Sequence, residues 1–148
     1  MAALPDPRPG FARLLSLTTT DAFAIDALRA PGRGAEAFDV HLLAGAASVS
    51  ADITTRWDAE DLRRLAEALE AIAGASAGSS VVATVHGGAA ARLDLEAEVA
   101  DAGRGELSVA VHLTPSGQDP FPRASFLLVC PAVRFARGAT AVRRLIEH

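Results

Sequence analysis

The sequence contains no tyrosine, lysine or asparagine, and it has one cysteine and one tryptophan among 148 residues. Because Cys130 is the single cysteine, an internal disulfide is excluded and a cysteine-based zinc site is not expected. Aromatic residues make up 5% of the chain and hydrophobic residues 50%, which predicts a core built mainly of Ala, Val and Leu. All 14 basic residues are arginine, a bias typical of a GC-rich genome rather than a sign of arginine chemistry.

Long apolar runs and clustered basic residues are also missing. No hydrophobic stretch reaches the length of a membrane span, and Arg13 and Ser16 interrupt the apolar stretch from Phe11 to Leu17. This interruption argues against a signal peptide, although residues 22–24 have the small-residue form of a cleavage site. The net charge of −4 disfavours nucleic-acid binding and allows a cationic partner. We therefore expect a cytoplasmic protein that binds neither membranes nor nucleic acids.

The chain length suits one domain with a substantial core. Residues 1–10 are rich in proline and predict a loose N-terminal tail, whereas residues 11–148 predict a single domain. The pattern of residues 11–28 is compatible with two short strands. Residues 37–42 predict a strand that pairs with an alternating strand ending at Thr54, so these two strands are expected to form a hairpin.

Two independent signals mark the start of a helix at Asp58. Asp61, three residues later, completes a capping box, and Trp57 with Leu62 forms a hydrophobic staple. Apolar residues then recur at helical spacing, and Gly74 marks the C-terminal end of the helix. This helix start is the element boundary that the sequence defines most firmly.

Strands dominate the rest of the chain. Residues 81–85, 93–99 and 107–113 alternate between apolar and polar, and the last two segments form the clearest hairpin. The uninterrupted apolar run at 124–130 predicts a central strand, and apolar residues from Phe135 onward predict a C-terminal helix. Because the strands cluster rather than alternate with helices, the predicted fold class is α+β. It comprises an antiparallel sheet of five or more strands with two helices packed on one face.

Candidate catalytic motifs are weak in this sequence. Residues 74–78 have the letters of a GxSxG nucleophile elbow, but a helix precedes them and a strand follows, the reverse of the order that the elbow needs. Cys130 ends an apolar strand, where it is expected to pack as a small hydrophobe. None of the 4 histidines has the spacing of a helical metal motif. The sequence thus predicts no catalytic residue, no cofactor and no metal site.

An acidic row is the clearest candidate for a functional surface. Asp94, Glu96 and Glu98 alternate along one predicted strand, so they project from one sheet face about 7 Å apart. His112 on the next strand shares this face if the hairpin pairs in register. A plain solvated face and a metal or proton-transfer site are both compatible with these residues. Since a row of carboxylates speeds the encounter with a basic protein, we predict that Asp94, Glu96, Glu98 and His112 bind a partner.

The segment from Phe38 to Leu69 has a hairpin, the tripeptide Ile53-Thr54-Thr55 and a Leu-rich helix at 61–69. It resembles the WapI-type immunity proteins of bacterial polymorphic toxin systems and related actinobacterial domains of unknown function. Residues 81–148 follow the order of strands and helix in that family. The resemblance implies an immunity protein that occludes a toxin, and it carries no catalytic residues over to this chain.

The expected function is therefore non-enzymatic protein binding, with an immunity protein against a basic toxin domain as the specific hypothesis. The acidic row, or the loops at 31–36 and 115–123, would meet that partner. Two alternatives stay open. One is a small-ligand-binding or catalytic domain with a pocket between sheet and helix. The other is a homo-oligomeric structural protein, since a homodimer is also compatible with the sequence.

Overall fold

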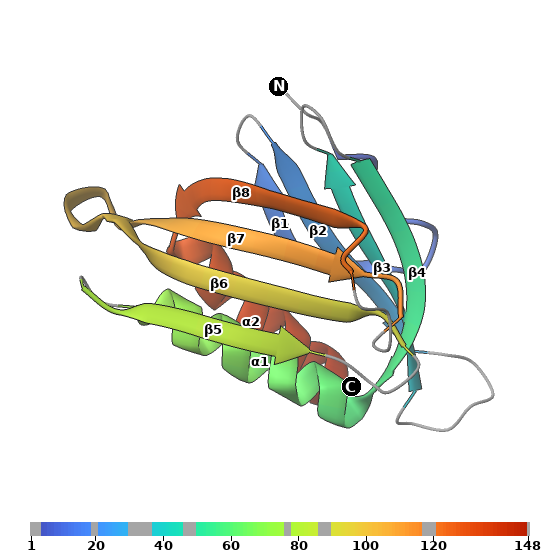
Figure 1. Cartoon of the computed structure of the whole chain (residues 1–148). Coiled ribbons are helices and arrows are strands. Elements are labelled where there is room, and N and C mark those ends of the chain that lie inside the picture. Colours follow the sequence, from blue (N-terminus) through green and yellow to red (C-terminus); the bar gives the residue numbers. More distant parts are fainter. Residues whose placement is uncertain are drawn as a thin grey trace.

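The structure is a computed structural model that describes residues 4–18, 21–29, 37–45, 50–75, 78–85, 90–116 and 121–147. In this part of the chain, four antiparallel strands followed by a helix occur twice in succession (Figure 1). The first group consists of β1 (Ala12–Thr18), β2 (Ala22–Arg29), β3 (Ala37–Gly45), β4 (Ser50–Asp58) and α1 (Ala59–Ala73). The second group consists of β5 (Ser80–Val85), β6 (Arg92–Asp101), the short η1 (Ala102–Arg104), β7 (Glu106–Thr114), β8 (Ala124–Pro131) and α2 (Val133–Glu147).

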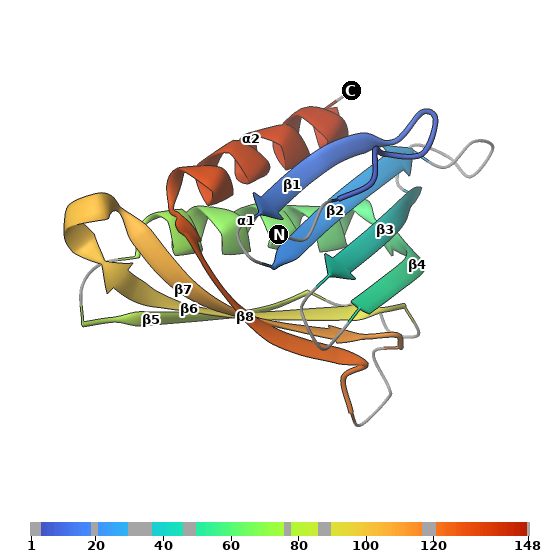
Figure 2. The ribbon, with the colours of Figure 1, turned by 90° about the horizontal axis from the view of Figure 1, so that it is seen from above.

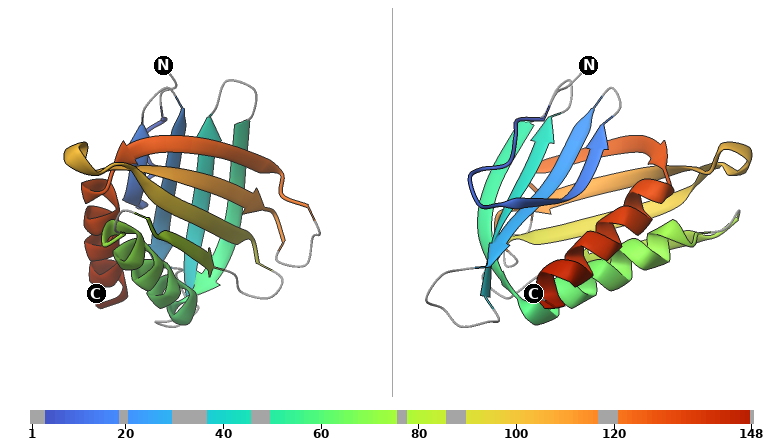
Figure 3. Two further views of the ribbon diagram at one scale, coloured as in Figure 1. Left: turned by 60° about the vertical axis from the view of Figure 1, so that its left-hand side comes forward. Right: turned by 180° about the vertical axis from the view of Figure 1, so that it is seen from behind.

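The predicted α+β class is confirmed, and the strands divide between two four-stranded sheets. We call β1–β4 the N-terminal sheet and β5–β8 the C-terminal sheet; in each, the strands are neighbours in chain order. The strands of one sheet cross those of the other, while α1 and α2 lie side by side along one flank (Figure 2, Figure 3). α2 packs against β1, and α1 packs against β5. Neither helix covers the outer face of the C-terminal sheet, which faces the viewer in Figure 1.

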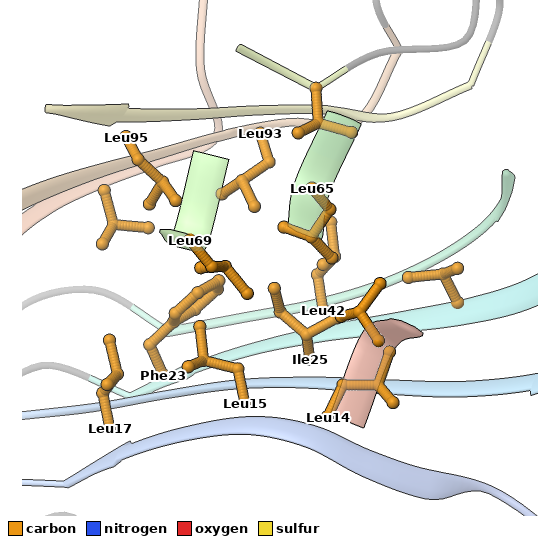
Figure 4. Close-up of a cluster of buried hydrophobic side chains, with 14 of the residues drawn as sticks. Leu14, Leu15, Leu17, Phe23, Ile25, Leu42, Leu65, Leu69, Leu93 and Leu95 are labelled. Carbon is orange, nitrogen blue, oxygen red and sulfur yellow. The ribbon is translucent and has the colours of Figure 1, made fainter. Parts of the chain in front are cut away.

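One apolar core joins both sheets and both helices. Figure 4 shows side chains from different elements meeting in it, among them Ile25 of β2, Leu69 of α1 and Leu93 of β6. The rings of Phe23 and Phe126 make an edge-to-face contact between the two sheets, with centroids 6.3 Å apart. Full burial of one such side chain stabilises the folded state by roughly 1.5–3 kcal/mol. Burial of apolar side chains in this shared core is therefore the main interaction that holds the two sheets together.

The junction between β4 and α1 confirms the predicted helix start. The Asp58 carboxylate accepts a hydrogen bond from the Asp61 N–H at 2.8 Å, and the Asp61 carboxylate accepts one from the Asp58 N–H at 3.2 Å. Trp57 is buried, and its indole N–H donates to the Ala91 carbonyl at 3.0 Å. The Ala91 N–H in turn donates to the Thr55 hydroxyl at 2.9 Å. This junction therefore also fastens β4 to the start of β6, a link that the sequence pattern did not predict.

The prediction of a central strand at 124–130 is wrong, because β8 is an edge strand that pairs with β7. An uninterrupted apolar run is typical of a strand covered on both faces, but no described helix or strand covers the outer face here. Leu127 and Val129 consequently remain 59% and 44% exposed.

Gly138 lies in the middle of α2, at a point where the helix packs tightly against β1 and α1. A Cβ atom at this position would lie 2.9 Å from Leu15 Cδ1 and 3.2 Å from Leu69 Cδ1. Because such distances are shorter than van der Waals contact, a side chain at position 138 would force Leu15 and Leu69 or the helix itself to shift. The glycine therefore permits the close packing of α2, and it does not mark a helix boundary.

We predict that Gly138→Val lowers the free energy of unfolding by about 2–3 kcal/mol, because the added carbons overpack the contact with Leu15 and Leu69. Ala136→Val on the exposed face of the same helix is the matched control, with an expected cost below about 1 kcal/mol. Urea unfolding followed by circular dichroism measures both. Equal losses in the two variants would contradict the packing role of Gly138.

Candidate functional site

The outer face of the C-terminal sheet brings the four predicted site residues together. Asp94, Glu96 and Glu98 point outward from β6, and Asp94 is directly opposite His112 of β7 in the strand register. We call this surface the acidic face and define it by the outward residues of all four strands. They are Ser80, Val82, Thr84, Asp94, Glu96, Glu98, Ser108, Ala110, His112, Ser125, Leu127 and Val129.

Asp94 and His112 are each engaged with neighbours on the acidic face. The Asp94 carboxylate accepts hydrogen bonds from the Thr84 hydroxyl at 2.6 Å and from Arg92 Nε at 3.0 Å. His112 Nδ1 lies 2.8 Å from the Ser125 hydroxyl oxygen. These two residues therefore help to hold the strands in register, and both Asp94 carboxylate oxygens and His112 Nδ1 already have partners.

Glu96 and Glu98 differ from Asp94 because both are exposed and neither forms a hydrogen bond or ion pair with another described residue. They border a shallow depression of about 240 Å³. Its other lining residues have mostly small side chains and are Ser80, Ser108, Ala110 and Leu127. Two unneutralised carboxylates beside a shallow depression can receive a cationic group with an aliphatic stem, such as an arginine side chain.

Exposed apolar side chains flank these carboxylates on both edge strands. Val82 on β5 is 70% exposed, and Leu127 and Val129 on β8 are 59% and 44% exposed. These exposed side chains of β8 were not predicted from the sequence, because the 124–130 run was expected to lie inside the sheet. The signal in the sequence was the apolar run itself, which also fits an edge strand with an uncovered face. Apolar and acidic groups thus share one open surface, where the apolar side chains offer area to bury against a partner and the carboxylates can attract a basic one.

A second group of charged residues lies on the outer face of the N-terminal sheet. Arg13, Asp26 and His41 are neighbours on β1, β2 and β3. The fully buried Asp26 carboxylate accepts two hydrogen bonds from Arg13, at 2.8 and 3.1 Å. The hydrogen bond to Asp26 raises the pKa of Arg13 above its ordinary value. We call these three residues the buried ionic row.

The N-terminal segment 4–10 lies over the buried ionic row. The Pro5 carbonyl accepts a hydrogen bond from Arg13 at 2.7 Å, and the Arg8 guanidinium lies 3.9 Å from Asp52. Asp52 also pairs with His41 Nε2, whereas His41 Nδ1 has no hydrogen-bond partner among the described residues. Because the charges of Arg13 and Asp26 compensate each other within the chain, we interpret the row as a structural element. The buried ionic row was not predicted from the sequence, since its three residues come from separate strands.

The remaining candidate positions are Cys130, the possible metal ligands and the two predicted loops. Cys130 is buried, and burial raises the pKa of its thiol to about 11. No three His, Cys, Asp or Glu side chains of the described residues gather as metal ligands. Within the same residues, no helix is both long and apolar enough to cross a membrane. The loop at 31–36, residues 117–120 of the other predicted loop, His86 and His148 lie outside the part of the chain that the structure describes.

We predict that Arg13→Met lowers the free energy of unfolding by about 3 kcal/mol, because it leaves the buried Asp26 carboxylate without its cation. Arg56→Met is the matched control, since it breaks a more exposed pair with Asp39 on the same sheet face and is expected to cost less than about 1 kcal/mol. Urea unfolding at neutral pH measures both losses. A cost of Arg13→Met no larger than that of the control would contradict the role given to the buried ionic row.

We predict that the Cys130 thiol of the folded chain reacts with iodoacetamide at pH 8 at least about a hundredfold more slowly than in urea. A pKa raised from 9.0 to about 11 keeps the thiol protonated at this pH and lowers the reactive thiolate fraction by roughly that factor. The rate should rise with pH until the pH passes the raised pKa. Mass spectrometry of the alkylated chain measures the rate, and fast modification of the folded chain at pH 8 would refute an inert thiol.

Comparisons with known proteins add nothing to this geometry. No protein-family model, no curated protein and no solved structure matches the chain. The resemblance to WapI-type immunity proteins therefore stays a prediction, and the surfaces of the two sheets are the observations that bear on function.

Proposed function

We propose that this chain is a non-enzymatic protein-binding domain whose acidic face binds a protein with a basic surface. The observation that carries the proposal is the pair of exposed, unneutralised carboxylates of Glu96 and Glu98 between the exposed apolar side chains of β5 and β8. No described helix covers this face of the four-stranded sheet, so a partner can reach it without any rearrangement of the helices.

Charge and apolar area would act at different stages of binding. The two carboxylates attract a basic partner during diffusion and orient it before contact. Removal of Val82, Leu127 and Val129 from water then stabilises the complex, since they are the large apolar side chains exposed on this face. Asp94 and His112 contribute by holding the strands that present these groups.

We further propose that the partner is a toxin domain and that the chain acts in the cytoplasm as its immunity protein. The order of strands and helices and the resemblance at 38–69 support this choice. In this mechanism the domain blocks a basic functional surface of the toxin by covering it, and no bond is made or broken.

The interior of the domain supports an external binding surface over an internal pocket. The space between the sheets and α1 contains apolar side chains such as Leu65, Leu69 and Leu95 (Figure 4). A ligand pocket at this place would need polar groups that converge inward. The polar side chain that points from β4 toward β6, Thr55, is already bonded to the Ala91 N–H.

We predict that Glu96→Gln with Glu98→Gln slows association with the partner about tenfold and flattens its salt dependence, because two attractive charges are removed. The partner to use is the protein encoded by the adjacent gene, since immunity genes lie beside the toxin genes that they neutralise. Surface plasmon resonance at low and physiological salt measures the rates.

Glu67→Gln with Glu147→Gln is the matched control, because it removes the same charge from exposed positions on the two helices. This variant is expected to associate within about twofold of the wild-type rate. Co-expression of the chain with the neighbouring gene product should also rescue growth. Equal slowing by both double variants would argue against the acidic face, and absence of both binding and rescue would refute the immunity function.

A further inference from the structure

Strand β8 leaves an apolar edge of the C-terminal sheet unpaired. Its only described partner strand is β7, and Figure 1 shows β8 as the outermost strand of the sheet. Most of the large hydrophobic side chains that are exposed among the described residues lie on or beside this strand. They are Phe121, Leu127, Val129 and Val133, with exposed fractions of 78%, 59%, 44% and 49%.

The β8 edge lacks the features that normally keep sheet edges from pairing. It contains no charged residue, has no proline before its last residue, and pairs with β7 without a register shift. The edges of the N-terminal sheet differ, since β1 contains Arg13 and a bulge, and β4 contains Asp52 and Arg56. The uncharged β5 is shorter and packs against α1. An unprotected, regular and apolar edge of this kind is suited to accept another strand.

The alternation of hydrogen bonds between β7 and β8 shows which backbone N–H groups of β8 point to its free edge. The Ala132 N–H donates to the Gly105 carbonyl at 2.8 Å, in continuation of the β7–β8 ladder. Because bonding residues alternate along an antiparallel strand, the even-numbered residues of β8 bond to β7. The N–H groups of Ser125, Leu127 and Val129 therefore point to the free edge, and these same residues carry the exposed side chains.

We propose that β8 pairs antiparallel with β8 of a second copy of this chain, about a two-fold axis at Leu127. This register places Leu127 opposite the second copy's Leu127 and Ser125 opposite the second copy's Val129. All of these residues have outward N–H groups, so the ladder of hydrogen bonds is complete. Because β8 is uncharged, the pairing buries no charge, and the two-fold symmetry leaves neither β8 edge open.

The proposed pairing is compatible with the acidic face. Glu96 and Glu98 lie on β6, so five strand spacings, roughly 24 Å, separate the acidic pairs of the two copies. This separation exceeds the Debye length of about 8 Å at physiological ionic strength, so repulsion between the pairs is screened. The dimer would present one continuous eight-stranded surface with the apolar residues of β8 at its centre and a carboxylate pair on each side.

Sedimentation velocity and amide hydrogen exchange test the proposal on the full chain. The expected result is a species of twice the monomer mass of 15.2 kDa that dissociates on dilution. The Leu127 and Val129 N–H groups should exchange at least about tenfold more slowly in concentrated than in dilute solution. The Leu128 N–H, which bonds to β7, should exchange slowly at both concentrations and serves as the internal control.

Leu127→Lys is expected to abolish dimerisation, because it places two like charges opposite each other at the axis. Val82→Lys adds the same charge to the same face on the other edge strand and should remain dimeric. A wild-type chain that is monomeric and whose Leu127 N–H exchanges fast overturns the proposal. The proposal is equally overturned if this N–H is protected only when a different protein is added. A dimer that survives in Leu127→Lys also overturns it. The exchange measurement uses the wild-type chain, so it does not depend on whether a variant folds. Neither outcome decides the binding test with the product of the adjacent gene.

Discussion

The close contact of α2 with β1 and α1 at Gly138 is the constraint on which the arrangement of layers depends. The absence of a side chain there lets α2 settle against both neighbours, and Arg143 joins the helices at their surface through an ion pair with Glu70 at 2.5 Å. Both helices therefore lie side by side along one flank of the two sheets. Since neither helix covers the outer face of the C-terminal sheet, the acidic face is left open by this packing.

The two sheets use their outer faces in different ways. On the N-terminal sheet, Arg13 and Asp26 neutralise each other beneath the segment that contains Pro5 and Arg8. A buried ion pair of this kind is costly to break and contributes little net stability. Arg13 of this pair also holds the segment against the sheet through its hydrogen bond to the Pro5 carbonyl. On the C-terminal sheet, the charges of Glu96 and Glu98 have no partner among the described residues. Exposed apolar area can be buried against another protein, and the unneutralised charge beside it can attract a basic one.

The acidic face and the β8 edge need not compete with each other. The carboxylates lie on β6, near the middle of the sheet, whereas the apolar side chains lie chiefly at β8. A pairing of two copies through β8 would order the apolar strip and leave both carboxylate pairs exposed to a basic partner. Charge would then attract the foreign partner, whereas backbone pairing along the β8 edge would join the two copies.

The sequence by itself determined the local elements. The capping box at Asp58 and Asp61 depends only on neighbouring residues, so it was predictable, as was the face shared by Asp94, Glu96, Glu98 and His112, because strand alternation dictates it. Tertiary structure decided how the strands divide between two sheets, that β8 is an edge, and that Arg13, Asp26 and His41 meet. These features depend on contacts between residues far apart in the chain. An apolar run records a preference for burial but does not say whether another layer is available to cover it.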